Sequence, residues 1–160
     1  MSNAYTRGLF ALSLLVAFTL QIIALPDAVS AMRPMWVVVL IGYWSFYGPN
    51  LPMTLIAFLT GLACDVLYNT PLGQHGLGLL LVAYALTRLR SNLGLFPLWQ
   101  QTLALMPAWF LYALLQFWLD GMARHAAEAS LRFLPVIPTI FCWPLLCSAL
   151  DALRGPGGRV

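Results

Sequence analysis

The stretch LPMTLIAFLTGLACDVLYN, residues 51–69, is a predominantly apolar segment with a single charged side chain, Asp65. About 20 apolar residues, each adding about 1.5 Å of helix, cross the ~30 Å hydrocarbon core of a bilayer. The stretch therefore predicts a transmembrane helix. Of the 160 residues in the chain, 61% are hydrophobic and 8% are charged, whereas a soluble domain carries about 25% charged residues. This composition excludes a conventional water-exposed globular domain.

Other segments of the chain repeat this pattern. Apolar runs bounded by charge, glycine or proline occupy residues 9–26, 34–48, 76–89, 96–119 and 134–153, and a short tail follows at 154–160. Together with residues 51–69 they predict an all-α polytopic membrane protein, a single transmembrane domain over residues 1–160 with about six transmembrane helices. The runs at 34–48 and 76–89 are short for a span. A re-entrant segment at 76–89 would leave five spans.

The distribution of arginine predicts the orientation, because cytoplasmic loops carry an excess of Lys and Arg. All eight basic residues are arginine. With six spans and a cytoplasmic N-terminus, five arginines fall inside and three fall outside, where three acidic residues balance them. The inner arginines are Arg7, Arg88, Arg90, Arg154 and Arg159; the outer ones are Arg33, Arg124 and Arg132, beside Asp27, Asp120 and Glu128. We therefore expect both termini to be cytoplasmic. The first apolar run exceeds that of a typical signal peptide, so we expect it to be retained.

Asp65 lies about one helical turn from the outer end of its predicted span, where a carboxylate is costly unless it faces protein or water. Gly61 and Asn69 lie four residues to either side, on the same helix face. Two interpretations are open. In the functional interpretation, Asp65 is a ligand-binding or proton-linked carboxylate. In the structural interpretation, Asp65 either accepts hydrogen bonds from the amides of the turn at 69–73, which includes Gly73, or pairs with Arg33. We favour the structural interpretation.

Aromatic residues form a stripe along the second predicted helix. Trp36, Tyr43, Trp44 and Tyr47 are spaced so that they share one face. Since the sequence shows no polar partners converging there, the stripe is interpreted as packing or as a lipid-facing ridge, in preference to a ligand site.

The segment between the last two predicted spans has a helical pattern. Arg124, Glu128 and Arg132 are spaced at i, i+4 and would support a short helix on the outer membrane face. This helix is interpreted as a solvated connector or as a docking surface for an extracytoplasmic partner.

Residues for catalysis or for cofactor binding are not apparent in the sequence. His75 and His125 have no Cys or carboxylate at metal-ligand spacing, and the three cysteines lack the paired spacing of a zinc or redox site. The small and dispersed net charge of +3 does not indicate nucleic-acid binding. We therefore predict no enzymatic activity, no metal and no cofactor.

Three stretches, taken in their order and separations, resemble the rod shape-determining protein family MreD. They are RPMWV at 33–37 leading to Tyr43-Trp44, GLACDV at 61–66 leading to Leu72-Gly73, and LWQQ at 98–101. The resemblance covers nearly the whole chain.

The resemblance implies a non-enzymatic subunit of the bacterial cell-wall elongation complex, the elongasome, in the cell inner membrane. The expected partners are MreC directly, RodA with its penicillin-binding transpeptidase, MreB filaments indirectly, and membrane lipids. It also implies a fold similar to the membrane-embedded substrate-binding subunits of energy-coupling-factor vitamin transporters. The alternative function is therefore a small-molecule or lipid-binding membrane subunit with a pocket near Asp65.

Overall fold

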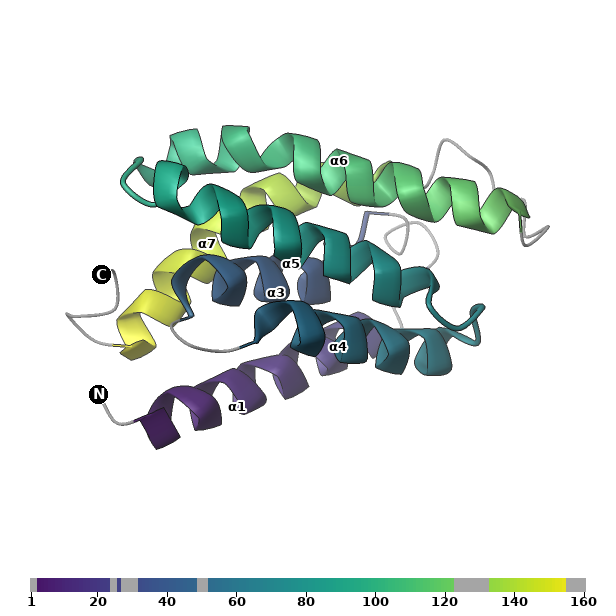
Figure 1. The fold of residues 1–160 in the computed structure, drawn as a ribbon, viewed down its shortest axis with the longest axis horizontal. Helices are drawn as coiled ribbons and strands as arrows, with labels where there is room; N and C mark the ends of the chain where they lie inside the picture. The colour runs from purple at the N-terminus through teal and green to yellow at the C-terminus, as the bar shows by residue number, and fades with distance from the viewer. Residues whose placement is uncertain (1–2, 24–25, 27–31, 49–51, 123–132, 155–160) are drawn as a thin grey trace.

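The computed structural model describes residues 3–23, 26, 32–48, 52–122 and 133–154, and this part of the chain folds into six α-helices (Figure 1). In chain order they are α1 (Asn3–Ile22), α3 (Trp36–Tyr47), α4 (Met53–Tyr68), α5 (Gln74–Leu93), α6 (Leu98–Met122) and α7 (Val136–Arg154). The all-helical fold predicted from the apolar runs is confirmed.

Three of these helices are long and apolar enough to cross a bilayer. The qualifying segments are Tyr5–Ile22 of α1, Leu98–Gly121 of α6 and Val136–Arg154 of α7. Helices α3 and α4 are also apolar but shorter. The expected run at 76–89 is part of a longer helix, because α5 extends through polar residues at both ends to reach 20 residues.

Helix α3 forms the centre of the fold (Figure 1). Its ten consecutive residues from Val37 to Phe46 are buried. A helix that is apolar all round is stable only when protein or lipid covers every face. Here α1, α4, α5 and α7 all pack against α3.

Helices α4 and α5 form an antiparallel hairpin in which the two backbones approach closely (Figure 1). A Cβ built on Gly61 would lie 2.6 Å from the carbonyl carbon of His75 and would also meet the backbone of Gly76. Real Cβ atoms do not approach backbone so closely. Glycine at position 61 is therefore what allows this contact, as small residues do between membrane helices.

The helices alternate in direction, so the bundle has two distinct ends. Figure 1 places the first turn of α1, the last turn of α7 and the α5–α6 turn at one end, which we call the terminal end. The hydroxyl of Tyr5 donates to the carbonyl of Leu153 there, at 3.0 Å. The α4–α5 turn and the last turn of α6 lie at the opposite end, which we call the Asp65 end.

Candidate functional site

Asp65 is completely buried at the end of α4, and its carboxylate is surrounded by hydrogen-bond donors from the following turn. Its Oδ2 accepts the N–H of Gly73 at 2.8 Å, and its Oδ1 accepts the N–H of His75 at 2.8 Å. The Thr70 hydroxyl donates to Oδ1 at 3.0 Å, and Nδ1 of His75 lies 2.8 Å from the same oxygen. The carboxylate thus satisfies amides at the start of α5, where a helix leaves its first N–H groups unpaired.

The backbone of the turn folds to bring these donors to Asp65. Asn69 ends α4 in the left-handed conformation, at φ 53° and ψ 40°, and the N–H of Thr70 donates to the Asp65 carbonyl at 3.0 Å. Gly73 precedes α5 at φ 97°, a region that favours glycine because it has no Cβ. Asp65, Asn69 and Gly73 therefore encode a turn whose backbone folds back onto the Asp65 carboxylate.

Arg33 lies apart from this carboxylate. Its guanidinium donates to the carbonyls of Gln21 and Ile23 at the C-terminal end of α1, where the helix dipole and unpaired carbonyls favour a cation. Within the described residues the salt-bridge partner of Asp65 is His75. The pairing of Arg33 with Asp65, one of the two structural alternatives from sequence, does not occur in the structure.

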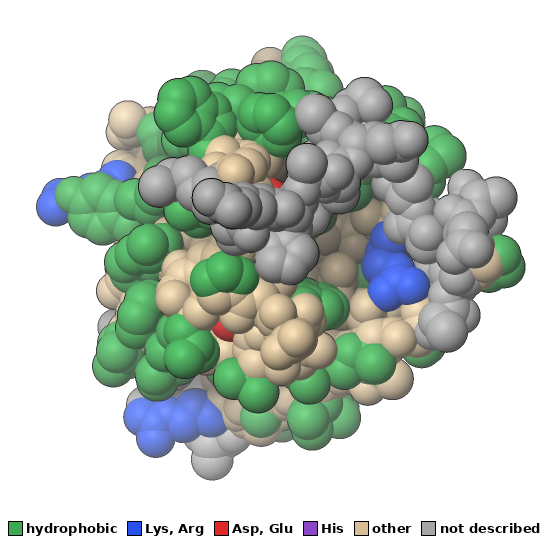
Figure 2. Space-filling view, turned by 90° about the vertical axis from the view of Figure 1, so that its right-hand side faces the viewer, with side chains coloured by type: hydrophobic (Ala, Val, Ile, Leu, Met, Phe, Trp, Pro, Cys, Tyr) green, Lys and Arg blue, Asp and Glu red, His purple; other side chains and the backbone are tan. Residues whose placement is uncertain are grey.

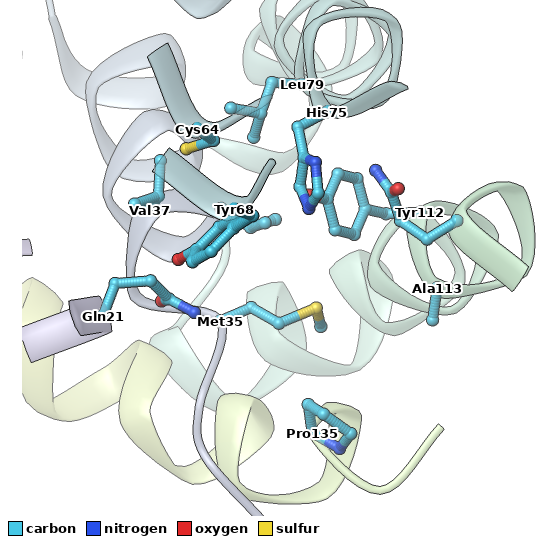
Figure 3. Close-up of a pocket in the computed structure, with 12 residues that line it drawn as sticks. Gln21, Met35, Val37, Cys64, Tyr68, His75, Leu79, Tyr112, Ala113 and Pro135 are labelled. Carbon is cyan, nitrogen blue, oxygen red and sulfur yellow. The ribbon is translucent and has the colours of Figure 1, made fainter. Parts of the chain in front are cut away.

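A small cavity of about 130 Å³ lies beside the Asp65 turn. Figure 3 shows the rings of Tyr68, His75 and Tyr112 facing this space, with Gln21 and Met35 on its other side. Figure 2 views the same end of the molecule, where apolar side chains are spread around the visible face and acidic side chains show only as small patches. Asp65 itself does not line the cavity, and its contact with that space is through His75.

A second polar cluster joins the start of α5 to the end of α6, and the sequence analysis did not predict it. The buried amide of Gln74 donates to Asp120 Oδ1 at 2.6 Å. The amide of Gln116 donates to the Gln74 carbonyl at 3.3 Å. These residues are more than 40 positions apart, and the i, i+4 spacing of Gln116 and Asp120 on α6 was the only available signal.

Tyr43 and Trp44 of the aromatic stripe on α3 lie in the protein interior, and the stripe does have polar partners, so the premise that none converge there is wrong. Tyr43 and Trp44 are fully buried, and the Tyr43 hydroxyl donates to Asp151 Oδ1 at 2.7 Å. Arg154 donates to the Tyr43 hydroxyl at 3.3 Å and to the Tyr47 carbonyl at 2.9 Å. Its guanidinium also lies 5.4 Å from the centre of the Trp44 ring. Trp44 Nε1 also donates to the Ser13 hydroxyl of α1 at 3.2 Å, and the Tyr47 hydroxyl donates to Gln101 Oε1 of α6 at 2.5 Å. These partners lie at least 31 residues away in the chain, so local spacing could not indicate them.

Trp36, the first residue of the stripe, borders an apolar groove of about 380 Å³ between α1 and α7. Leu40 of α3 contributes to its floor, and side chains including Val16 and Leu145 form the walls. The backbone N–H of Trp36 donates to the side-chain oxygen of Gln21 at 3.2 Å. Trp36 is therefore separated from the polar cluster around Tyr43.

The predicted outer helix with Arg124, Glu128 and Arg132 lies outside the described residues. Within the part of the chain that the structure describes, three or more His, Cys, Asp or Glu side chains do not gather into a group that could hold a metal ion.

Comparison with known proteins points to one family. The family model described as rod shape-determining protein MreD matches residues 2–151. The rod shape-determining protein MreD of Haemophilus influenzae is 29% identical over 139 residues, which cover 87% of this chain and 86% of that protein. No solved structure matches the chain.

Proposed function

This chain belongs to the MreD family of rod shape-determining proteins, and from that membership we propose that it is a non-enzymatic inner-membrane subunit of the bacterial cell-wall elongation complex. The observation that carries the proposal is the family match over residues 2–151. A role in cell shape follows from the family. The location in the complex and the partners are the proposed part.

The proposed direct partner is MreC, which has a single membrane helix. RodA and its penicillin-binding transpeptidase act with this pair in peptidoglycan synthesis, and MreB filaments are linked to it indirectly. A subunit without catalytic residues acts through its surfaces. The apolar groove between α1 and α7 supports this, because it runs along two long apolar helices and includes the small residues Ala17 and Ala149. Small residues let a second membrane helix approach closely.

Co-purification tests this proposal. MreC expressed with this chain is expected to be recovered with it from mild detergent. Leu145→Trp narrows the groove and should lower the recovery of MreC severalfold, because a mispacked helix interface loses about 1–3 kcal/mol. Leu103→Trp is the matched control, since Leu103 is an exposed leucine on α6 outside the groove. Separate recovery of the two wild-type proteins would contradict the proposal, and equal recovery with both variants would place the contact on another face.

We also propose that all six helices cross the membrane, with both termini in the cytoplasm. The alternation of the helices supports this arrangement, since the first turn of α1 and the last turn of α7 lie at the same end (Figure 1). The shorter helices α3 and α4 would cross as part of a bundle whose neighbours cover them.

Site-directed labelling tests the orientation. Leu72 in the α4–α5 turn is 76% exposed, and Leu95 in the α5–α6 turn is 93% exposed. In a background without Cys64, Cys142 and Cys147, cysteine at position 72 is expected to react with an impermeant maleimide from the periplasm and cysteine at position 95 only after lysis. Labelling of both positions from the same side would refute the six-span arrangement.

A fold similar to the substrate-binding subunits of energy-coupling-factor transporters is also proposed, and the arrangement of six helices is the observation in its favour. The cavity beside His75 has a volume of about 130 Å³, which is below the roughly 300–1,000 Å³ of sites for drug-sized ligands. Asp65 is fully engaged by the turn. A vitamin-sized ligand therefore does not fit, and shape determination through partner contacts is the better supported function.

A further inference from the structure

We propose that an apolar groove between α5 and α6 binds one acyl chain of an anionic phospholipid, with the phosphate of the lipid held by Arg88. The groove has a volume of about 300 Å³. Such a site goes beyond the proposed role in the elongation complex, although it rests on the proposed membrane location of these two helices. It needs no protein partner, so a failure of lipid binding and a failure to recover MreC would be separate results.

The depth of the groove matches one leaflet of a bilayer. The groove extends along α5 from Gly78 to Leu89, beside the antiparallel residues 104–115 of α6 (Figure 1). At its inner end the two helices touch, since a Cβ built on Gly78 would lie 2.7 Å from Cε2 of Tyr112. Its other end lies toward the α5–α6 turn, at the terminal end of the bundle. The helix rise from Gly78 to Leu89 is about 16 Å, close to half of the ~30 Å hydrocarbon core.

The lining of the groove suits a hydrocarbon chain. Small side chains from both helices, including Ala85 and Ala108, leave the space between them, and Pro107 of α6 also borders it. The leucines at the rim, Leu81 and Leu111, are exposed, so the groove opens on the outside of the bundle. Aliphatic side chains offer no hydrogen-bond donor or acceptor. A methylene chain therefore fills this space without leaving a polar group unpaired.

Arg88 lies where the head group of such a lipid would be. It follows Leu81 by seven residues, or two helical turns, so the two side chains share a face of α5 at the rim of the groove. Its side chain is exposed, and among the described residues its guanidinium has no hydrogen bond or ion pair. The guanidinium lies 5.4 Å from the centre of the exposed Tyr84 ring. This contact is weak at an exposed site, so the guanidinium is available for bidentate binding of a phosphate.

The charge around Arg88 favours a lipid with a net negative charge. Arg90 adds a second cation in the last turn of α5. The acids of the described residues lie elsewhere, with Asp65 and Asp120 at the opposite end and Asp151 hydrogen-bonded within the bundle. All phospholipids carry a phosphate, but a choline group places a cation beside it, which the arginines repel. Phosphatidylglycerol has no such cation, so the site should prefer it.

Native mass spectrometry of the full chain in non-ionic detergent tests this selectivity. The protein is equilibrated with equal amounts of phosphatidylglycerol and phosphatidylcholine with matched acyl chains. We expect about fivefold more phosphatidylglycerol bound, which corresponds to about 1 kcal/mol for one arginine at a membrane surface. Arg88→Gln should remove this preference. Arg90→Gln is the matched control and should retain it, because position 90 is about 200° around the helix from position 88.

Filling the groove tests the position of the acyl chain independently of charge. Ala108→Leu places a larger side chain in the groove and should lower phosphatidylglycerol binding severalfold. Ala149→Leu is the matched control, since Ala149 lines the other apolar groove, between α1 and α7, and it should bind as the wild type does. If Ala108→Leu does not fold, the exposed Arg88 still provides the test.

Three results would overturn the proposal. The first is equal binding of both lipids to the wild type, and the second is a preference that persists in Arg88→Gln. The third is binding that is unchanged in folded Ala108→Leu, including the case in which Ala149→Leu lowers it and so places the lipid between α1 and α7.

Discussion

Replacing Asp65 with alanine is expected to lower the stability of the protein by about 3 kcal/mol or more, because partly buried donors lose a buried, charged acceptor. The N–H groups of Gly73 and His75 and the Thr70 hydroxyl all donate to this carboxylate. Without it they are left unpaired between α4 and α5. The measurement is the melting temperature and the folded yield in detergent by fluorescence-detected size-exclusion chromatography.

Asp65→Asn is the informative companion to this variant. The amide keeps one oxygen acceptor but loses the charge, and its N–H₂ group faces other donors, so an intermediate loss is expected. A melting temperature and yield for Asp65→Ala equal to those of the wild type would show that the carboxylate does not stabilise the turn. Equal and large losses in both variants would indicate that its charge provides most of the stabilisation.

The second large effect is expected at the contact between α4 and α5. Gly61→Ala places a methyl group against the backbone of His75 and Gly76, and backbone cannot rotate away as a flexible side chain can. The two helices must then separate, at a cost of about 1–3 kcal/mol or more. The measurement is the melting temperature in the same detergent.

Gly8→Ala is the matched control for this substitution. Gly8 lies within α1, and a Cβ added there meets nothing within 4 Å. Alanine should be neutral there or stabilising by up to about 1 kcal/mol, because it has the higher helix propensity. Equal melting temperatures for the Gly61 and Gly8 variants would refute the close contact at Gly61.

The sequence predicted the helices well because apolar runs and their boundaries are local features. Each of the six expected runs overlaps one helix of the described structure. The ends of α5 were harder to predict from the sequence, because a helix that is packed at its centre can continue through polar residues such as Gln74 and Arg90. Composition therefore located the helices but underestimated the length of this one.

The sequence could predict those contacts of the candidate site that join residues close together in the chain. Asp65 and the amides of its turn are separated by at most ten residues, and the sequence identified the loop as one possible partner. Contacts between distant segments were not predictable. Asp151 reaches Tyr43 across 108 positions, and Asp120 reaches Gln74 across 46. The packing of α3 against α7 places the first pair together, and spacing along the chain cannot show it.

The Asp65 turn joins neighbouring segments of the chain, whereas the polar cluster around Tyr43 joins distant ones. This difference affects the order in which the protein acquires its structure during synthesis. The Asp65 turn needs only α4 and α5, so the hairpin can close as soon as these segments have left the ribosome. Tyr43 lies earlier in the chain, but its partners Asp151 and Arg154 are in the last helix. Since chains are made from the N-terminus and distant contacts form later, Tyr43 of the central helix obtains these polar partners only when translation is nearly complete.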